Sequence, residues 1–130
     1  MLHSMAVNVM DNAYVPYSKF KVGVAIKSVN NKYYVGCNVE NAAYPQGICA
    51  EAGAISAMVA GGCNLISEVL VVSDGDRLIV PCGGCRQKLL EFSKSDTRIF
   101  LATVTEIEKT LSIKELLPFS FDKRFLNFTE

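Results

Sequence analysis

The chain has no net charge, because its 13 lysines and arginines are matched by 13 aspartates and glutamates. Without an excess of positive charge it has no broad attraction to phosphate backbones, which argues against a nucleic-acid partner. It also has no apolar run long enough to span a bilayer. Its first residues, MLHSM, lack the basic region and apolar stretch of a secretion signal. We therefore expect a cytoplasmic protein that binds neither nucleic acid nor membrane.

Internal repeats, low-complexity tracts and linker-like segments are absent as well. The 130 residues, half of them hydrophobic, are enough to bury one core, so we expect a single domain spanning residues 1–130. The five cysteines are an odd number, which does not suit a disulfide framework. In a reducing compartment, clustered cysteines indicate metal binding or catalysis.

The spacing of apolar residues predicts helices and strands that alternate along the chain. Helices are expected over residues 2–14, 49–60, 82–93 and 112–117. Strands are expected over residues 20–29, 33–39, 68–72, 98–102 and, as a short one, 104–107. The first two strands should form a hairpin, and a loop should span residues 41–47. We predict an α/β fold, a three-layer α/β/α sandwich whose mixed, roughly five-stranded sheet is covered by helices on both faces.

Three cysteines stand where the chain enters two predicted helices: Cys49, and Cys82 and Cys85 in the PCGGC segment at 81–85. The two residues between Cys82 and Cys85 allow both thiolates to reach one tetrahedral zinc ion. Free N–H groups and a partial positive charge at a helix start lower the pKa of a nearby thiol. If Cys49 is the third ligand, the fourth position stays open, as in catalytic zinc sites. This predicts one Zn2+ per chain.

Glu51 lies two residues after Cys49, close enough to serve the metal site without having to ligate the ion. A carboxylate there can take a proton from water and pass it to a substrate ring nitrogen and then to leaving ammonia. In a dry pocket beside thiolates, its pKa should lie above that of a free glutamate. Zinc with three thiolates has a formal charge of −1, and the helix N-termini should recover part of its Lewis acidity. These groups predict hydrolytic deamination of an amidine-like carbon.

Simpler interpretations of the cysteines exist. A lone C-x-x-C is also typical of a structural zinc site or a redox pair, but a redox pair does not account for Cys49 and Glu51. A closed structural site needs a fourth ligand. The remaining thiols, Cys37 and Cys63, are expected in the core and in a turn, and His3 is expected at the surface. A non-catalytic zinc module that mediates protein contacts stays open as an alternative.

The segments CAE at 49–51 and PCGGCRQ at 81–87 together resemble the small, three-cysteine form of the cytidine deaminase family. The resemblance extends from YVPYSKF at 14–20 to LLP at 116–118. In zinc deaminases with this signature the glutamate is not a ligand, so Glu51 would be the catalytic residue. The resemblance implies hydrolysis of cytidine and deoxycytidine to uridine and deoxyuridine, with release of ammonia, in pyrimidine salvage.

The resemblance also implies residues around the substrate. Asn38 and Glu40, in the NVEN segment at 38–41, would hydrogen-bond the sugar hydroxyl. Such polar groups penalise a ligand that leaves them unpaired. Phe20 and, with weaker support, Tyr44 would pack near the nucleoside, and the backbone N–H of Ala50 would contact the base edge. A blasticidin-type deaminase shares the zinc motif but does not usually have NVEN, and neutral charge disfavours a tRNA- or DNA-editing deaminase.

Two further features concern the assembly and the zinc charge. The LLPFSF segment at 116–121 resembles the part that brings an aromatic ring into a neighbouring subunit's site in a homotetramer. Phe121 aligns best with that ring, and Phe119 is the rival. Many family members have an arginine directly after the catalytic glutamate, which offsets the thiolate charge, whereas this chain has Ala52. Compensation would then fall to Arg86 or to the helix N-termini.

Overall fold

The computed structural model describes residues 1–75 and 78–126. Within these residues the chain forms a five-stranded sheet in the order β2-β1-β3-β4-β5. The strands are β1 (Val22–Ser28), β2 (Tyr33–Cys37), β3 (Ile66–Ser73), β4 (Ser93–Ala102) and β5 (Ile107–Ser112). Strands β3 and β4 pair in parallel, and the other neighbouring strands pair antiparallel. The sheet is therefore mixed, and its first two strands form the predicted hairpin.

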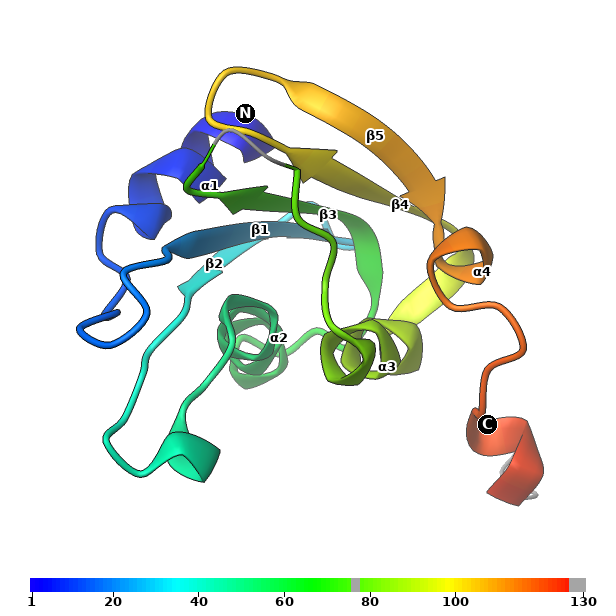
Figure 1. The fold of residues 1–130 in the computed structure, drawn as a ribbon. Coiled ribbons are helices and arrows are strands. Elements are labelled where there is room, and N and C mark those ends of the chain that lie inside the picture. The colour runs from blue at the N-terminus through cyan, green and yellow to red at the C-terminus, as the bar shows by residue number, and fades with distance from the viewer. Residues whose placement is uncertain (76–77, 127–130) are drawn as a thin grey trace.

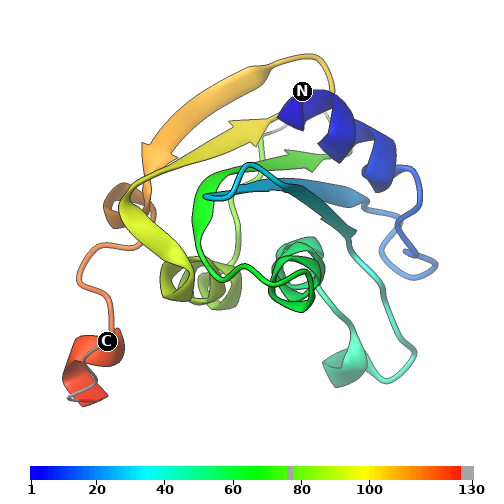
Figure 2. The same ribbon diagram turned by 180° about the vertical axis from the view of Figure 1, so that it is seen from behind.

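Helices cover both faces of this sheet (Figure 1). Helix α1 (Leu2–Met10) lies on one face, whereas α2 (Ala50–Ala60) and α3 (Gly83–Glu91) lie side by side on the other (Figures 1 and 2). The alternation of side chains along β1 serves both layers: Ala25 packs under α1, while Val24 and Ile26 join the larger core under α2 and α3. The predicted three-layer α/β/α sandwich is confirmed.

Most element boundaries differ from the prediction by at most two residues, and three elements differ by more. Helix α1 ends at Met10, because Tyr14 leaves the helix to form a bridge with Val39. Strand β4 begins at Ser93, five residues earlier than expected. The strand expected over 104–107 was misplaced: residues 103–106 make a turn in which Thr103 N–H donates to Glu106 O, and β5 follows it. A short helix, α4 (Ile113–Leu116), is capped by Ser112 and lies within the predicted range.

Helix α1 is anchored to the sheet by more than apolar packing. His3 is half-buried and places Nε2 2.8 Å from the backbone oxygen of Thr103, just after β4. Its expected surface position was therefore wrong, because the helix turns the imidazole toward the end of β4. Neither α1 nor any other helix in the described ranges is long and apolar enough to cross a membrane.

Strand β2 and helix α2 approach each other unusually closely. A Cβ added at Gly36 would stand 2.4 Å from the backbone nitrogen of Ala54 and 2.5 Å from the backbone oxygen of Ala50. Only a glycine leaves room for this contact, so the strand directly supports the first turn of α2. That turn contains the predicted catalytic glutamate, which ties the sheet to the functional site.

Candidate active site

The site begins at the N-termini of α2 and α3. Cys49 is the N-cap of α2 and Cys82 is the N-cap of α3, both with extended backbones. The first helical N–H groups have no partner within the helix, so both cysteines lie in a region of positive potential. Cys85 lies one turn into α3 and is buried. The predicted placement of cysteines at two helix starts is confirmed.

Three of the predicted residues converge into one cluster. The Sγ atoms of Cys49 and Cys85 and a carboxylate oxygen of Glu51 all lie within 4.8 Å of one another. The thiol of Cys85 donates to Cys49 Sγ at 2.9 Å. Cys82 is exposed and lies outside this group, although its charge acts on Cys85. Thiolate and carboxylate donors at this separation fit a zinc ion.

The two thiols of the cluster differ in pKa. The hydrogen bond from Cys85 lowers the pKa of Cys49 to about 6, and the Ala52 amide also lowers it. The same contact raises the pKa of Cys85, and burial and the Glu51 charge add to that shift. Cys49 is therefore the anionic member of the pair. Burial raises the pKa of Glu51, which is 5% exposed, as the sequence predicted.

A hollow with a volume of about 350 Å3 lies between the loop that contains Tyr17 and the loop that precedes Cys49. Its wall reaches Gly47, two residues before Cys49, so the chain itself places the hollow next to the N-terminus of α2. The rings of Tyr17 and Tyr44 meet edge to face across 6.3 Å. The described lining residues are Tyr17, Ser18, Glu40, Asn41, Tyr44 and Gly47. Their mix of aromatic and polar groups suits a small ligand with hydroxyl groups.

Glu40 is the most strongly hydrogen-bonded side chain of the hollow. Its carboxylate accepts from the backbone N–H groups of Tyr17 at 3.1 Å and Ser18 at 3.2 Å, and from the Ser18 hydroxyl. These bonds lower the pKa of Glu40, the Ser18 hydroxyl having the largest effect. The roles of Tyr17 and Ser18 were missed in the sequence, where the 14–20 segment was recognised only as a shared motif.

The remaining predicted substrate residues divide into two groups. Glu40 and Tyr44 line the hollow, and Ala50 is buried in the first turn of α2 beside the cluster. Asn38 instead accepts from Val22 N–H through Oδ1 and donates to Phe20 O through Nδ2, each at 2.9 Å. Its amide fixes the start of β1 in this structure. Asn38 and Phe20 are not among the described residues that line the hollow.

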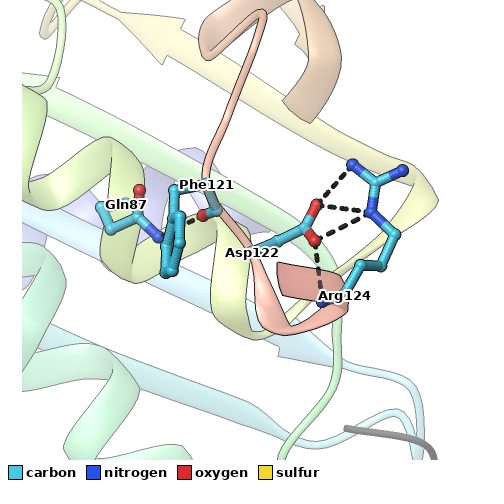
Figure 3. Close-up of polar contacts among 4 residues, drawn as sticks. All are labelled: Gln87, Phe121, Asp122 and Arg124. Carbon is cyan, nitrogen blue, oxygen red and sulfur yellow. Dashed lines mark hydrogen bonds and ion pairs between the residues drawn. The ribbon is translucent and has the colours of Figure 1, made fainter. Parts of the chain in front are cut away.

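The two C-terminal aromatic candidates lie on a segment beyond α4. The backbone oxygen of Phe121 accepts from Gln87 Nε2 of α3 at 2.9 Å, and Asp122 pairs with Arg124 close by (Figure 3). The Phe121 ring stacks on Phe125 at 5.3 Å and is 58% exposed. Phe119 is fully exposed and has a positive φ of 52°. Both rings are therefore available at the surface of the single chain.

The mixed α/β fold, with thiols and a buried carboxylate meeting at two helix N-termini, defines a zinc-binding hydrolase. The sequence model described as the cytidine and deoxycytidylate deaminase zinc-binding region matches residues 1–102, and the chain belongs to this family. The resemblance seen in the cysteine motifs is thereby confirmed. A zinc-binding region is a property of the family, which agrees with the cluster of Cys49, Glu51 and Cys85.

Relatives with known names cover nearly the whole chain. A cytidine deaminase of Sporosarcina psychrophila is 39% identical over 119 residues, covering 91% of this chain and 87% of its own length. One of Halalkalibacterium halodurans is 35% identical over 127 residues, covering 98% and 96%. The crystal structure of a Burkholderia pseudomallei cytidine deaminase superposes with a TM-score of 0.86 at 36% identity, covering 92% and 96%. The fold of this family is therefore the fold of the chain.

Proposed function

We propose that this chain is a cytidine deaminase, which hydrolyses cytidine and deoxycytidine to uridine and deoxyuridine and releases ammonia. One observation supports this most directly: a buried carboxylate, Glu51, lies within 4.8 Å of two thiols that could hold zinc. A hollow of about 350 Å3 reaches Gly47, two residues before Cys49. The relatives named cytidine deaminase, 35–39% identical over almost the full chain, support the same activity. Pyrimidine salvage is the process that this reaction would serve.

For the metal, we propose Cys49, Cys82 and Cys85 as the ligands of one Zn2+ per chain. Cys49 is already the anionic member of its pair, and the exposed side chain of Cys82 can turn toward the same point from the start of α3. When bound, zinc supplies Lewis acidity toward the water that attacks the base. Ligation requires reduced thiols, and the cytoplasm keeps thiols reduced, so we propose a cytoplasmic enzyme. Its single catalytic domain would span residues 1–130.

Glu51 would then move the protons of the reaction. It lies in the first turn of α2 at the edge of the cluster, and burial raises its pKa, so that it can hold a proton between two transfers. It would take one proton from the attacking water and give it to the ring nitrogen of the base. It would then take the second proton from the hydroxyl now on the attacked carbon and give it to the departing amine, so that this hydroxyl becomes the carbonyl and ammonia leaves. The neighbouring N–H of Ala50 would orient the base edge.

The hollow favours a nucleoside over a nucleotide. Among its described lining residues the only charged one is Glu40, a carboxylate. It would hydrogen-bond a sugar hydroxyl but repel a 5′-phosphate. Asn38 would join this contact by giving up one of its bonds to the β1 backbone, with Phe20 and Tyr44 packing near the sugar and base. The substrate proposed here is therefore cytidine rather than deoxycytidylate.

The assembly proposed for the enzyme is a homotetramer in which Phe121 reaches a neighbouring subunit's site. Within one chain, Phe121 is more than half exposed and lies on the segment that follows α4, held to α3 by Gln87 (Figure 3). An exposed aromatic ring on a tethered segment suits a contact with a second copy of the chain.

A direct assay tests this proposal. Adding cytidine to the zinc-loaded protein should give a steady loss of the ultraviolet absorbance of the cytosine ring. Deoxycytidine should react as well, and cytidine 5′-monophosphate at a rate at least about tenfold lower because of Glu40. Turnover of blasticidin without turnover of cytidine would replace the proposal by the blasticidin-type alternative. Zinc binding without turnover of any of these compounds would favour the structural zinc module.

A further inference from the structure

We propose that Lys88 is the cation that balances the negative charge of the thiolate cluster, the role left open by Ala52. This inference rests on the proposed zinc site. Three thiolates give bound zinc a formal charge of −1, and an ionised Glu51 adds a second negative charge beside it. The helix N-termini of α2 and α3 contribute only partial charges, each about half of one elementary charge. A full positive charge nearby would complete the balance.

The geometry of α3 points Lys88 toward the start of its own helix, on the side where Cys82 lies. Lys88 lies four residues after Gly84, on the same face of the helix. Its Nζ is 3.7 Å from the point where a Cβ on Gly84 would stand, and Cys82 Sγ is 4.0 Å from the same point. The lysine therefore folds back over the first turn of its own helix. Because Gly84 has no side chain, the ammonium group can come close to the thiols.

Cys82 and Cys85 both belong to the start of α3, and the thiol of Cys85 donates to Cys49 Sγ at 2.9 Å. A cation folded over the first turn of α3 therefore lies beside the thiols that would hold the metal.

Arg86, the compensating residue considered in the sequence, is engaged elsewhere. Its Nε donates to Pro81 O at 2.8 Å, and its Nη1 donates to Leu116 O at 3.0 Å. The guanidinium therefore ties the strand-to-helix loop to the end of α4. This is a structural task that fixes the guanidinium between two backbone carbonyls, whereas the ammonium group of Lys88 folds over the first turn of α3.

Lys88 acts through the cluster and not on the substrate, since it does not line the described part of the hollow. Its own side chain is exposed. A charge effect at an exposed position is weakened by salt, whereas a packing effect is not. Salt dependence therefore distinguishes the proposed role from a merely structural one.

The test is a series of variants with zinc affinity as the main readout. Lys88→Arg keeps the charge, Lys88→Met removes it, and Lys88→Glu reverses it. The zinc dissociation constant is measured by competition with a chelator at low salt and one fixed pH, because zinc held by three thiolates leaves the site with a formal charge of −1. Lys94→Met is the matched control, because Lys94 is an exposed lysine paired with Asp96 at 3.2 Å.

We expect Lys88→Arg and Lys94→Met to bind zinc like the unmodified protein. Lys88→Met should weaken zinc binding about three- to tenfold, and Lys88→Glu should weaken it further. These differences should shrink at about 1 M salt, where the Debye length falls to about 3 Å. The kcat for cytidine should fall in the same order, while KM stays constant.

Equal zinc affinity across the whole Lys88 series would overturn the proposal, as would an arginine variant that binds zinc as weakly as the methionine variant. Differences that persist unchanged at high salt would also overturn it, since they would indicate packing. If the unmodified protein bound no zinc, the proposed function itself would fail. If the unmodified protein bound zinc and deaminated cytidine, but all Lys88 variants bound zinc equally well, only the proposed role of Lys88 would be contradicted.

Discussion

Glu40 links two parts of the molecule through a single carboxylate. It receives three hydrogen bonds from Tyr17 and Ser18, which shape one wall of the hollow, and it is also the proposed partner of the sugar hydroxyl. A carboxylate has about four acceptor positions, so it can hold the loop and still accept from a ligand. At this site, recognition of the sugar and ordering of the loop depend on the same side chain.

Replacing Glu40 with alanine should raise the KM for cytidine by about tenfold or more, because the sugar contact and the loop contacts are lost together. Zinc content should not change, since Glu40 is not in the cysteine cluster. Steady-state kinetics with metal analysis of the same sample measures both quantities. Ser18→Ala, which removes a single donor, is the matched control and should have a smaller effect. An unchanged KM in the Glu40 variant would contradict the proposed sugar contact.

The pH dependence of this contact follows from the pKa of Glu40, which Ser18 and Tyr17 hold below its ordinary value of 4.5. A lowered pKa in the folded state means that the contact is present above the ordinary value and is lost as pH falls through the lowered one. The KM for cytidine should therefore show no Glu40-dependent rise between neutral pH and about pH 5. A rise with a midpoint near pH 6, absent from Glu40→Gln, would contradict this expectation.

Among the site residues, the sequence correctly predicted those whose role depends on their spacing within a motif. Cys49, Glu51 and Cys85 were expected near one point, and they lie there, because two helix starts define where such residues can meet. Ser18 was not expected, since its role depends on a loop that folds back to Glu40, and Lys88 was not expected, since its proposed role depends on a side chain that folds over the first turn of its own helix. No local pattern encodes such contacts.

Among the elements, helix α2 and strand β2 form the contact that positions the catalytic turn. Their backbones meet at Gly36 and Gly53, and a Cβ at Gly53 would meet only ordinary neighbours, the nearest being Gly36 Cα at 3.7 Å. The two glycines therefore differ in what they allow. Gly36 is required by the close approach of the backbones, whereas Gly53 lies in a helix interior with room to spare.

Gly36→Ala should lower the free energy of unfolding by about 1–3 kcal/mol, because the new methyl group meets backbone atoms that cannot move aside. It should also lower kcat by shifting the first turn of α2. Gly53→Ala is the matched control and should raise the free energy of unfolding by about 0.5–1 kcal/mol through helix propensity. Denaturant titrations of the zinc-loaded proteins measure both changes. Equal effects of the two substitutions would contradict the inferred approach of β2 to α2.

Sequence patterns predicted the position of helix α2 much more accurately than that of strand β5. Helix α2 was predicted almost to the residue, because Cys49 precedes an alanine-rich run that ends in glycines. Strand β5 was misplaced by several residues, because it is an edge strand whose sequence, IEKTLS, is largely exposed and has little apolar alternation. An edge strand is determined by pairing with its neighbour, here β4, and that pairing is not visible locally.

For the whole molecule, the proposed homotetramer explains why an exposed aromatic segment follows α4. Size-exclusion chromatography with light scattering should give a mass about four times that of one chain. Phe121→Ala should raise the KM for cytidine in the assembled protein, since the neighbouring site would lose its covering ring. Phe119→Ala is the matched control and should have little effect. The opposite order would assign the role to Phe119, and a fully active monomer would contradict the shared site.

The most direct test of the deaminase mechanism is the Glu51→Gln variant, with zinc content and cytidine turnover measured on the same sample. Glu51 is proposed to move protons without holding the metal, so the variant should keep about one zinc per chain and its fold. Its kcat should fall by at least about a hundredfold, since proton transfer is lost. A Glu51→Gln protein that retains full activity, or an unmodified protein that is active without metal, would contradict the account.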